Sequence, residues 1–142
     1  MQKIVPYLKL CVEHGASDIY FSAGATPMLR IEGEMRVVGR SVLTSDYVRE
    51  LAMSILTEEQ QAKFIAEREL DIATDAGGLG RFRVNLFTQR SSVAMVLRHV
   101  RTEIPALAEL NMPETLRELV MQKRGLILMV GATGSGKSTT LA

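Results

Sequence analysis

Eight residues near the C-terminal end of the chain restrict its fold more than any other stretch. Residues 131–138, Gly-Ala-Thr-Gly-Ser-Gly-Lys-Ser, fit the pattern G-x-x-x-x-G-K-[ST] in full. This pattern is typical of loops whose backbone amides surround a phosphate group. The all-apolar run 126–130 before it predicts a strand buried on both faces, and residues 139–142 predict the start of a helix. Strand, glycine-rich loop and helix start together predict a phosphate-binding loop.

Each residue type in this loop has a chemical reason. Glycines let the backbone bend where side chains would clash, and the positive end of the following helix dipole favours an anion. A lysine adds a mobile positive charge for the β- and γ-phosphates, and the Ser138 hydroxyl suits Mg²⁺ held through the nucleotide. The predicted nucleotide-binding residues of the loop are Thr133, Gly134, Ser135, Gly136, Lys137, Ser138 and Thr139.

The loop stands at the end of the 142-residue sequence. No second acidic strand for Mg²⁺ and no residue to activate water is evident in the sequence. We therefore expect the chain to be the N-terminal part of a larger ATPase, with no catalytic residues of its own.

Composition limits the class of protein. Apolar residues make up 46% and charged residues 23% of the chain, as in ordinary globular domains. The net charge of +1 predicts no general attraction to nucleic acid. The sequence has no apolar run long enough to span a membrane and no signal-peptide pattern, so we expect no membrane insertion. Cys11 is the only cysteine, which excludes an internal disulfide and favours a cytoplasmic protein.

The first hundred residues predict an α+β domain with a mostly antiparallel sheet and flanking helices. Apolar residues at helical spacing predict three helices. The first spans 2–14, and the second follows the cap candidates at 44–46. The third spans 57–68, where Thr57 and Gln60 have capping-box spacing. Strands are predicted over 18–22, 28–32, 34–38, 70–74, 81–88 and 93–100. In the strand 81–88, Phe82, Val84 and Leu86 alternate with Arg81, Arg83 and Asn85, so the arginines share the polar face.

Two proline pairs mark a linker after this domain. Ile104-Pro105 and Met112-Pro113 bound the segment, because a residue before proline is disfavoured in helices. A helix is predicted over 114–123. The predicted domains are therefore residues 1–101, a linker at 102–111, and the start of a second, truncated domain at 112–142.

Several motifs carry a resemblance to a known family. Residues 15–19 (Gly-Ala-Ser-Asp-Ile), 80–85 (Gly-Arg-Phe-Arg-Val-Asn) and 124–126 (Arg-Gly-Leu) ahead of the loop resemble the PilT/PilU retraction ATPases of type IV pili, within the secretion-ATPase superfamily. Ala132 stands where PilT proteins usually have proline. Together with residues 95–98 and 123–125, this makes the chain resemble the PilU branch more than the PilT branch.

The resemblance implies a PAS-like N-terminal domain followed by the start of a RecA-like α/β P-loop domain. It implies a cytoplasmic hexamer at the inner-membrane face that uses ATP and Mg²⁺ to drive pilus retraction, and hence twitching motility. The implied partners are the pilus inner-membrane platform protein and a second retraction ATPase. Two alternatives stay open: a non-catalytic assembly or partner-docking module, and a related type II secretion or pilus assembly ATPase.

Three arginines match family positions that reach nucleotide bound on the neighbouring domain: Arg81, Arg83 and Arg98. A guanidinium suits bidentate contact with phosphate. The alternative for these residues is pairing with carboxylates, or exposure on a solvated sheet face. His14 and His99 have no partner at metal-ligand spacing, so no metal site is predicted there.

Overall fold

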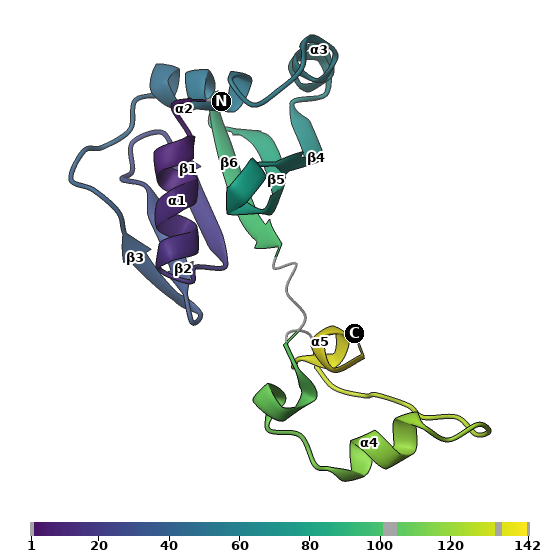
Figure 1. The fold of residues 1–142 in the computed structure, drawn as a ribbon. Helices are drawn as coiled ribbons and strands as arrows, with labels where there is room; N and C mark the ends of the chain where they lie inside the picture. Colours follow the sequence, from purple (N-terminus) through teal and green to yellow (C-terminus); the bar gives the residue numbers. More distant parts are fainter. Residues whose placement is uncertain (1, 101–104, 133–134, 142) are drawn as a thin grey trace. The chain divides into compact units, whose positions relative to one another are not determined.

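The computed structural model describes residues 2–100, 105–132 and 135–141. The chain divides into two compact units, Met1–Thr102 and Glu103–Ala142. Figure 1 shows most of the regular secondary structure in the first unit. The finer division into residues 1–101, 102–111 and 112–142 stays a prediction.

The first unit is built on one antiparallel sheet of six strands in the order β3-β2-β1-β6-β5-β4. The last strand in the sequence, β6, therefore pairs with the first. The predicted α+β class, with an antiparallel sheet and flanking helices, is confirmed. The strands are β1 (Asp18–Ser22), β2 (Met28–Ile31), β3 (Glu34–Val37), β4 (Glu69–Asp75), β5 (Arg81–Gln89) and β6 (Ser92–Val100).

Three α-helices accompany the sheet: α1 (Val5–Glu13), α2 (Ser45–Met53) and α3 (Glu58–Glu67). A 3₁₀ turn, η1 (Gly77–Leu79), joins β4 to β5. The hydroxyl of Thr44 accepts a hydrogen bond from the Tyr47 amide at 3.2 Å and begins α2. Thr57 and Gln60 form the predicted capping box of α3, with each side chain bonded to the other residue's amide. These caps satisfy amides that have no partner inside the helix.

The core lies between the sheet and α1 and α2. Alternate strand residues such as Ile19, Phe21 and Leu97 are fully buried on one face of the sheet. Helix α1 adds Leu8 and Cys11 to the same cluster, and α2 adds Val48, Leu51 and Ala52. Figure 1 shows α1 lying across this face. The arginines of β5 and β6 therefore point to the opposite face, which is called the open face below.

The second unit has only short elements in its described residues: η2 (Leu107–Leu110), α4 (Thr115–Val120) and α5 (Lys137–Leu141). The turn η2 falls within the segment predicted as a linker. Helix α4 is shorter than the helix predicted over 114–123. None of the described helices is long and apolar enough to cross a lipid bilayer.

The predicted strand over 126–130 is wrong. These residues have no regular structure, and the exposed fractions of Leu126, Leu128 and Val130 are 82%, 74% and 88%. A strand buried on both faces needs neighbouring strands to pair with and helices to cover it. The described part of the second unit, residues 105–132 and 135–141, contains no other strand. An apolar sequence pattern alone is therefore not sufficient to form a strand at residues 126–130.

Candidate functional site

In the predicted phosphate-binding loop, the lysine side chain is hydrogen-bonded to the backbone of the loop itself. The Lys137 ammonium donates hydrogen bonds to the carbonyl oxygens of Gly131, at 2.7 Å, and Ala132, at 2.6 Å. The Ser135 amide also donates to the Ala132 oxygen, at 3.2 Å. The positive charge is therefore held against the loop backbone, where an anion bound by the loop would meet it.

Two glycines of the loop differ in how strictly its shape requires them. Gly136 has a φ of +88°, which other residues rarely adopt, so a substitution there strains the backbone. A Cβ atom at Gly131 would lie 2.6 Å from the Ser135 hydroxyl oxygen, a clash that rotation of the Ser135 side chain relieves. The backbone therefore explains the glycine at position 136 but not the one at position 131.

The remaining loop residues are placed only in part. Thr133 and Gly134 lie outside the described residues. Lys137, Ser138 and Thr139 lie in the short helix α5. Among the described residues, no group of three or more acidic, histidine or cysteine side chains is arranged to hold a metal ion. Ser138 as a ligand of nucleotide-bound Mg²⁺ stays a prediction.

The three predicted arginines lie on the open face of the first unit. Arg83 is bound side-on by Asp71: Nε donates to both carboxylate oxygens, at 3.0 and 3.1 Å, and Nη2 contacts Oδ2. Arg98 donates through Nε to Oδ1 of Asp18 at 2.9 Å. Arg81 begins β5 directly opposite Asp75 of β4. Pairing with carboxylates, one alternative raised from the sequence, is therefore present for Arg83 and Arg98.

Asp18 was not predicted as part of this site. It is only 2% exposed, and the Ser17 hydroxyl donates to its second carboxylate oxygen at 2.8 Å. Alternation along β1 places Asp18 on the open face. The sequence could not predict its contact with Arg98, however, because the two residues are 80 positions apart and meet only through the pairing of β1 with β6. Asp71 was missed for the same reason, since the β4–β5 register decides its partner.

A polar hollow of about 290 Å³ lies between these ion pairs. A second hollow of about 520 Å³ on the sheet shares only Asp71 and Arg83 with it. The hydrogen bond from Arg83 lowers the pKa of Asp71, so this carboxylate stays ionised at neutral pH. The first hollow is lined by Asp18, Asp71, Arg83, Asn85, Val96 and Arg98.

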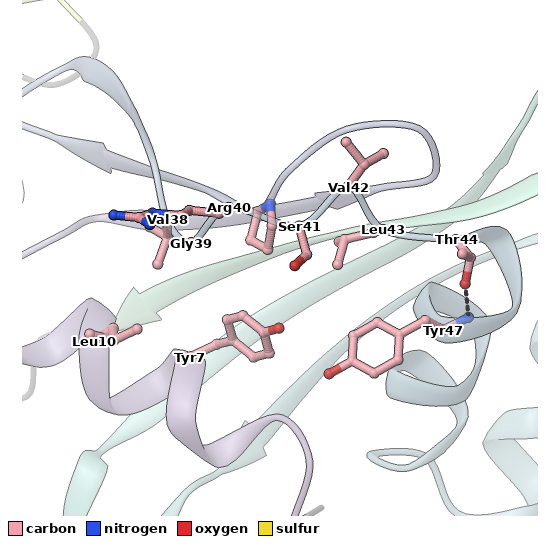
Figure 2. Close-up of a pocket in the computed structure, with 11 residues that line it drawn as sticks. Tyr7, Leu10, Val38, Gly39, Arg40, Ser41, Val42, Leu43, Thr44 and Tyr47 are labelled. Atoms are coloured by element: carbon pink, nitrogen blue, oxygen red, sulfur yellow. Dashed lines mark hydrogen bonds between the residues drawn. The ribbon is translucent and has the colours of Figure 1, made fainter.

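A groove of about 580 Å³ lies on the helix side of the same unit, under the loop between β3 and α2. Figure 2 shows Tyr7 of α1 and Tyr47 of α2 pointing toward one another beneath this loop. Burial, followed by the neighbouring Tyr47, raises the pKa of Tyr7 to about 12. The Tyr7 ring also meets Phe21 edge-on at 5.0 Å. Arg40 also lines this groove, but the predicted arginines of β5 and β6 gather on the open face, so the open face is the stronger candidate site.

Cys11 is part of the core of the first unit. It is fully buried, and its thiol lies 3.4 Å from the Ala16 carbonyl oxygen. Burial, followed by the negative charge of Asp18, raises its pKa to about 11. The thiol is therefore protonated at neutral pH, which makes it a poor nucleophile.

Comparisons with known proteins agree with the motifs. The chain is 44% identical to the type IV pilus ATPase PilU of Pseudomonas aeruginosa over 95% of its length. It is 37% identical to the type IV pilus retraction ATPase PilT of the same organism over 98% of its length. It spans 35% and 40% of these relatives, respectively.

A solved structure supports the same relationship. The crystal structure of the pilus retraction motor PilT with bound ADP superposes with a TM-score of 0.81 at 41% identity, and the match covers 97% of this chain and 40% of that one. The family model described as type II/IV secretion system protein matches residues 2–142. The chain therefore belongs to the type II/IV secretion system protein family and is similar to the PilT/PilU pilus ATPases, with higher identity to PilU than to PilT.

Proposed function

We propose that this chain is the N-terminal part of a motor ATPase that binds and hydrolyses ATP to drive type IV pilus retraction, and so twitching motility. The observation that carries the proposal is the loop at 131–138, where the Lys137 ammonium is bonded to the Gly131 carbonyl oxygen and Gly136 has a positive φ. Similarity to PilU and PilT supports the assignment to pilus motors rather than to other P-loop proteins.

In this proposal the loop binds the phosphates of ATP. Residues Thr133–Thr139 supply backbone amides and hydroxyls, Lys137 supplies positive charge, and Ser138 binds Mg²⁺ through the nucleotide. Bound nucleotide would add negative charge that Mg²⁺ and Lys137 offset. Residues 1–142 bind nucleotide without turning it over, because the site residues assigned to the loop include no carboxylate.

The working assembly is proposed to be a cytoplasmic hexamer at the inner-membrane face. Its partners are the pilus platform protein and a second retraction ATPase, and nucleic acid is not among them. Arg83 and Arg98, with Arg81 at the strand end, are proposed to contact nucleotide bound on the P-loop domain. Their common position on the open face supports this role, since one surface presents all three guanidinium groups.

A second candidate function is an assembly or partner-docking module without chemistry. The specific observation in its favour is the apolar edge of the open face, where Met35 and Val37 of β3 are 46% and 60% exposed. A related type II secretion or pilus assembly ATPase is also compatible with the family.

Calorimetry with ATP and Mg²⁺ tests the proposal. We expect saturable binding to the chain, weakened at least about tenfold in Lys137→Ala, which removes the charge that contacts the phosphates. Lys123→Ala is the matched control, because Lys123 is an exposed lysine of the same unit outside the loop. Equal binding by the chain and Lys137→Ala would contradict the assignment of the loop. Sustained ATP turnover that is lost in Lys137→Ala would contradict both binding without turnover and the docking module.

A further inference from the structure

Two positive charges face one another at the centre of the open face. Arg83 of β5 and Arg98 of β6 are direct partners across the strands. Like charges in such positions repel. Each guanidinium is bound by a carboxylate from the next strand outward, Arg98 by Asp18 of β1 and Arg83 by Asp71 of β4. The order across β1, β6, β5 and β4 is therefore negative, positive, positive, negative, and Arg30 of β2 lies opposite Asp18 on its other side.

The two ion pairs differ in how firmly the carboxylate is held. The two arginine side chains are equally exposed, 64% for Arg98 and 65% for Arg83. The Asp18 side chain, however, is 3% exposed, whereas that of Asp71 is 42% exposed. Asp18 is also bonded by Ser17. Asp18 cannot leave its partners without losing buried hydrogen bonds, whereas water can replace Arg83 at Asp71.

The two arginines also differ in the nitrogen atoms that are engaged. Asp18 binds Arg98 through Nε, and a guanidinium carries two further terminal nitrogens. The Arg98 side chain is 64% exposed and lines the hollow. Asp71 engages both Nε and Nη2 of Arg83. An arriving anion therefore meets donors already oriented on Arg98, but it must compete with Asp71 for Arg83.

We propose that Asp18 is a positioning residue that orients Arg98 toward an anion of the phosphate class, and that Asp71 is a built-in competitor that occupies Arg83 until this anion displaces it. The inference rests on the proposed function, in which the phosphate chain of a nucleotide is the anion brought to this face. The 290 Å³ hollow between the two pairs is the place where such a chain would bridge both guanidinium groups.

The test uses inorganic tripolyphosphate as the probe and Lys137→Ala as the background for every variant. This background removes the charge of the phosphate-binding loop, so the change in affinity that each open-face substitution causes reports the open face. The readouts are the dissociation constant and the NMR signals of the Arg83 and Arg98 Nε–H groups. Because ATP binding at the loop is measured separately, failure of the loop assignment and failure of this inference give different results.

Removal of the two carboxylates is expected to have opposite effects. Asp71→Asn should tighten tripolyphosphate binding about two- to fivefold, since it removes an exposed ion pair that competes for Arg83. Asp18→Asn should weaken it about two- to tenfold, because Arg98 must then be ordered by the anion itself. Arg98→Lys, at an exposed side chain, should weaken binding similarly while keeping the charge. This second variant tests the positioning even if Asp18→Asn does not fold.

Glu69→Gln is the control for net charge. Glu69 is exposed on the same face of β4 as Asp71. Glu69→Gln removes the same negative charge as Asp71→Asn. A similar gain in Glu69→Gln and Asp71→Asn would overturn the competitor role. Tighter binding in Asp18→Asn, or unchanged binding in Arg98→Lys, would overturn the positioning role. Absence of tripolyphosphate binding in the Lys137→Ala background would overturn the whole inference.

Discussion

The two units of the chain treat similar apolar sequences in opposite ways. In the first unit, the strand residues Phe82, Val84 and Leu86 are fully buried, because β4 and β6 flank their strand and residues of α1 and α2 complete the core cluster around them. In the second unit, the equally apolar run 126–130 is largely exposed and has no regular structure. The difference shows that an apolar sequence favours burial but does not secure it. Burial also needs other strands and helices that can pack against the segment.

Truncation of one apolar residue in each unit gives the largest expected contrast. Phe82→Ala should lower the free energy of unfolding by about 3–5 kcal/mol, because it leaves a cavity in a closed core. Leu128→Ala should change it by no more than about 0.5 kcal/mol, since the side chain is 74% exposed. Urea unfolding followed by circular dichroism measures both. A cost for Leu128→Ala near that of Phe82→Ala would mean that residues 126–130 pack in solution.

The reactivity of a thiol in each unit is a second test of the difference in burial between the two units. A Leu128→Cys variant carries one thiol in each unit, at position 128 and at the fully buried Cys11. The thiol at position 128 should react with a disulfide reagent at neutral pH at least about 100-fold faster, because the Cys11 thiol has a pKa near 11 and needs an opening of the core. Stopped-flow absorbance separates the two phases. A single fast phase would show that the first core is open.

Helix capping gives the smallest expected difference in unfolding free energy between the two units. Thr57→Ala removes the capping box of α3 and should lower the free energy of unfolding by about 1 kcal/mol. Helix α4 of the second unit begins at Thr115, and its N-cap residue Glu114 makes no capping hydrogen bond and only an exposed contact with Arg117, so Glu114→Ala should have an effect below about 0.5 kcal/mol. Paired urea titrations test this. Equal losses in the two variants would mean that the α4 terminus is stabilised by a contact of Glu114.

The features predicted correctly are those decided by neighbours in sequence. The capping box joins residues three positions apart, and the alternation in β5 requires only the pleat of one strand. The carboxylate partners of Arg83 and Arg98 depend instead on which strands pair and in which register, so no local pattern contained Asp18 or Asp71. The strand over 126–130 failed because its apolar pattern requires neighbours that the described second unit lacks. The assignment of the loop to nucleotide phosphates stays a prediction.

The strand order has a consequence for how the first unit folds. The sheet consists of two local meanders, β3-β2-β1 and β6-β5-β4, which meet only where β1 pairs with β6. Pairing of β1 with β6 brings together residues about 80 positions apart. The chain loses conformational entropy in this step before most of the stabilising contacts between the two meanders can form. During synthesis, the β1 edge of the first meander stays unpaired until β6 has left the ribosome, although α1 and α2 are already available to cover its apolar face. We therefore expect this closure to be a late, long-range step of folding, and a nascent chain halted before β6 to present an unpaired strand edge that favours aggregation.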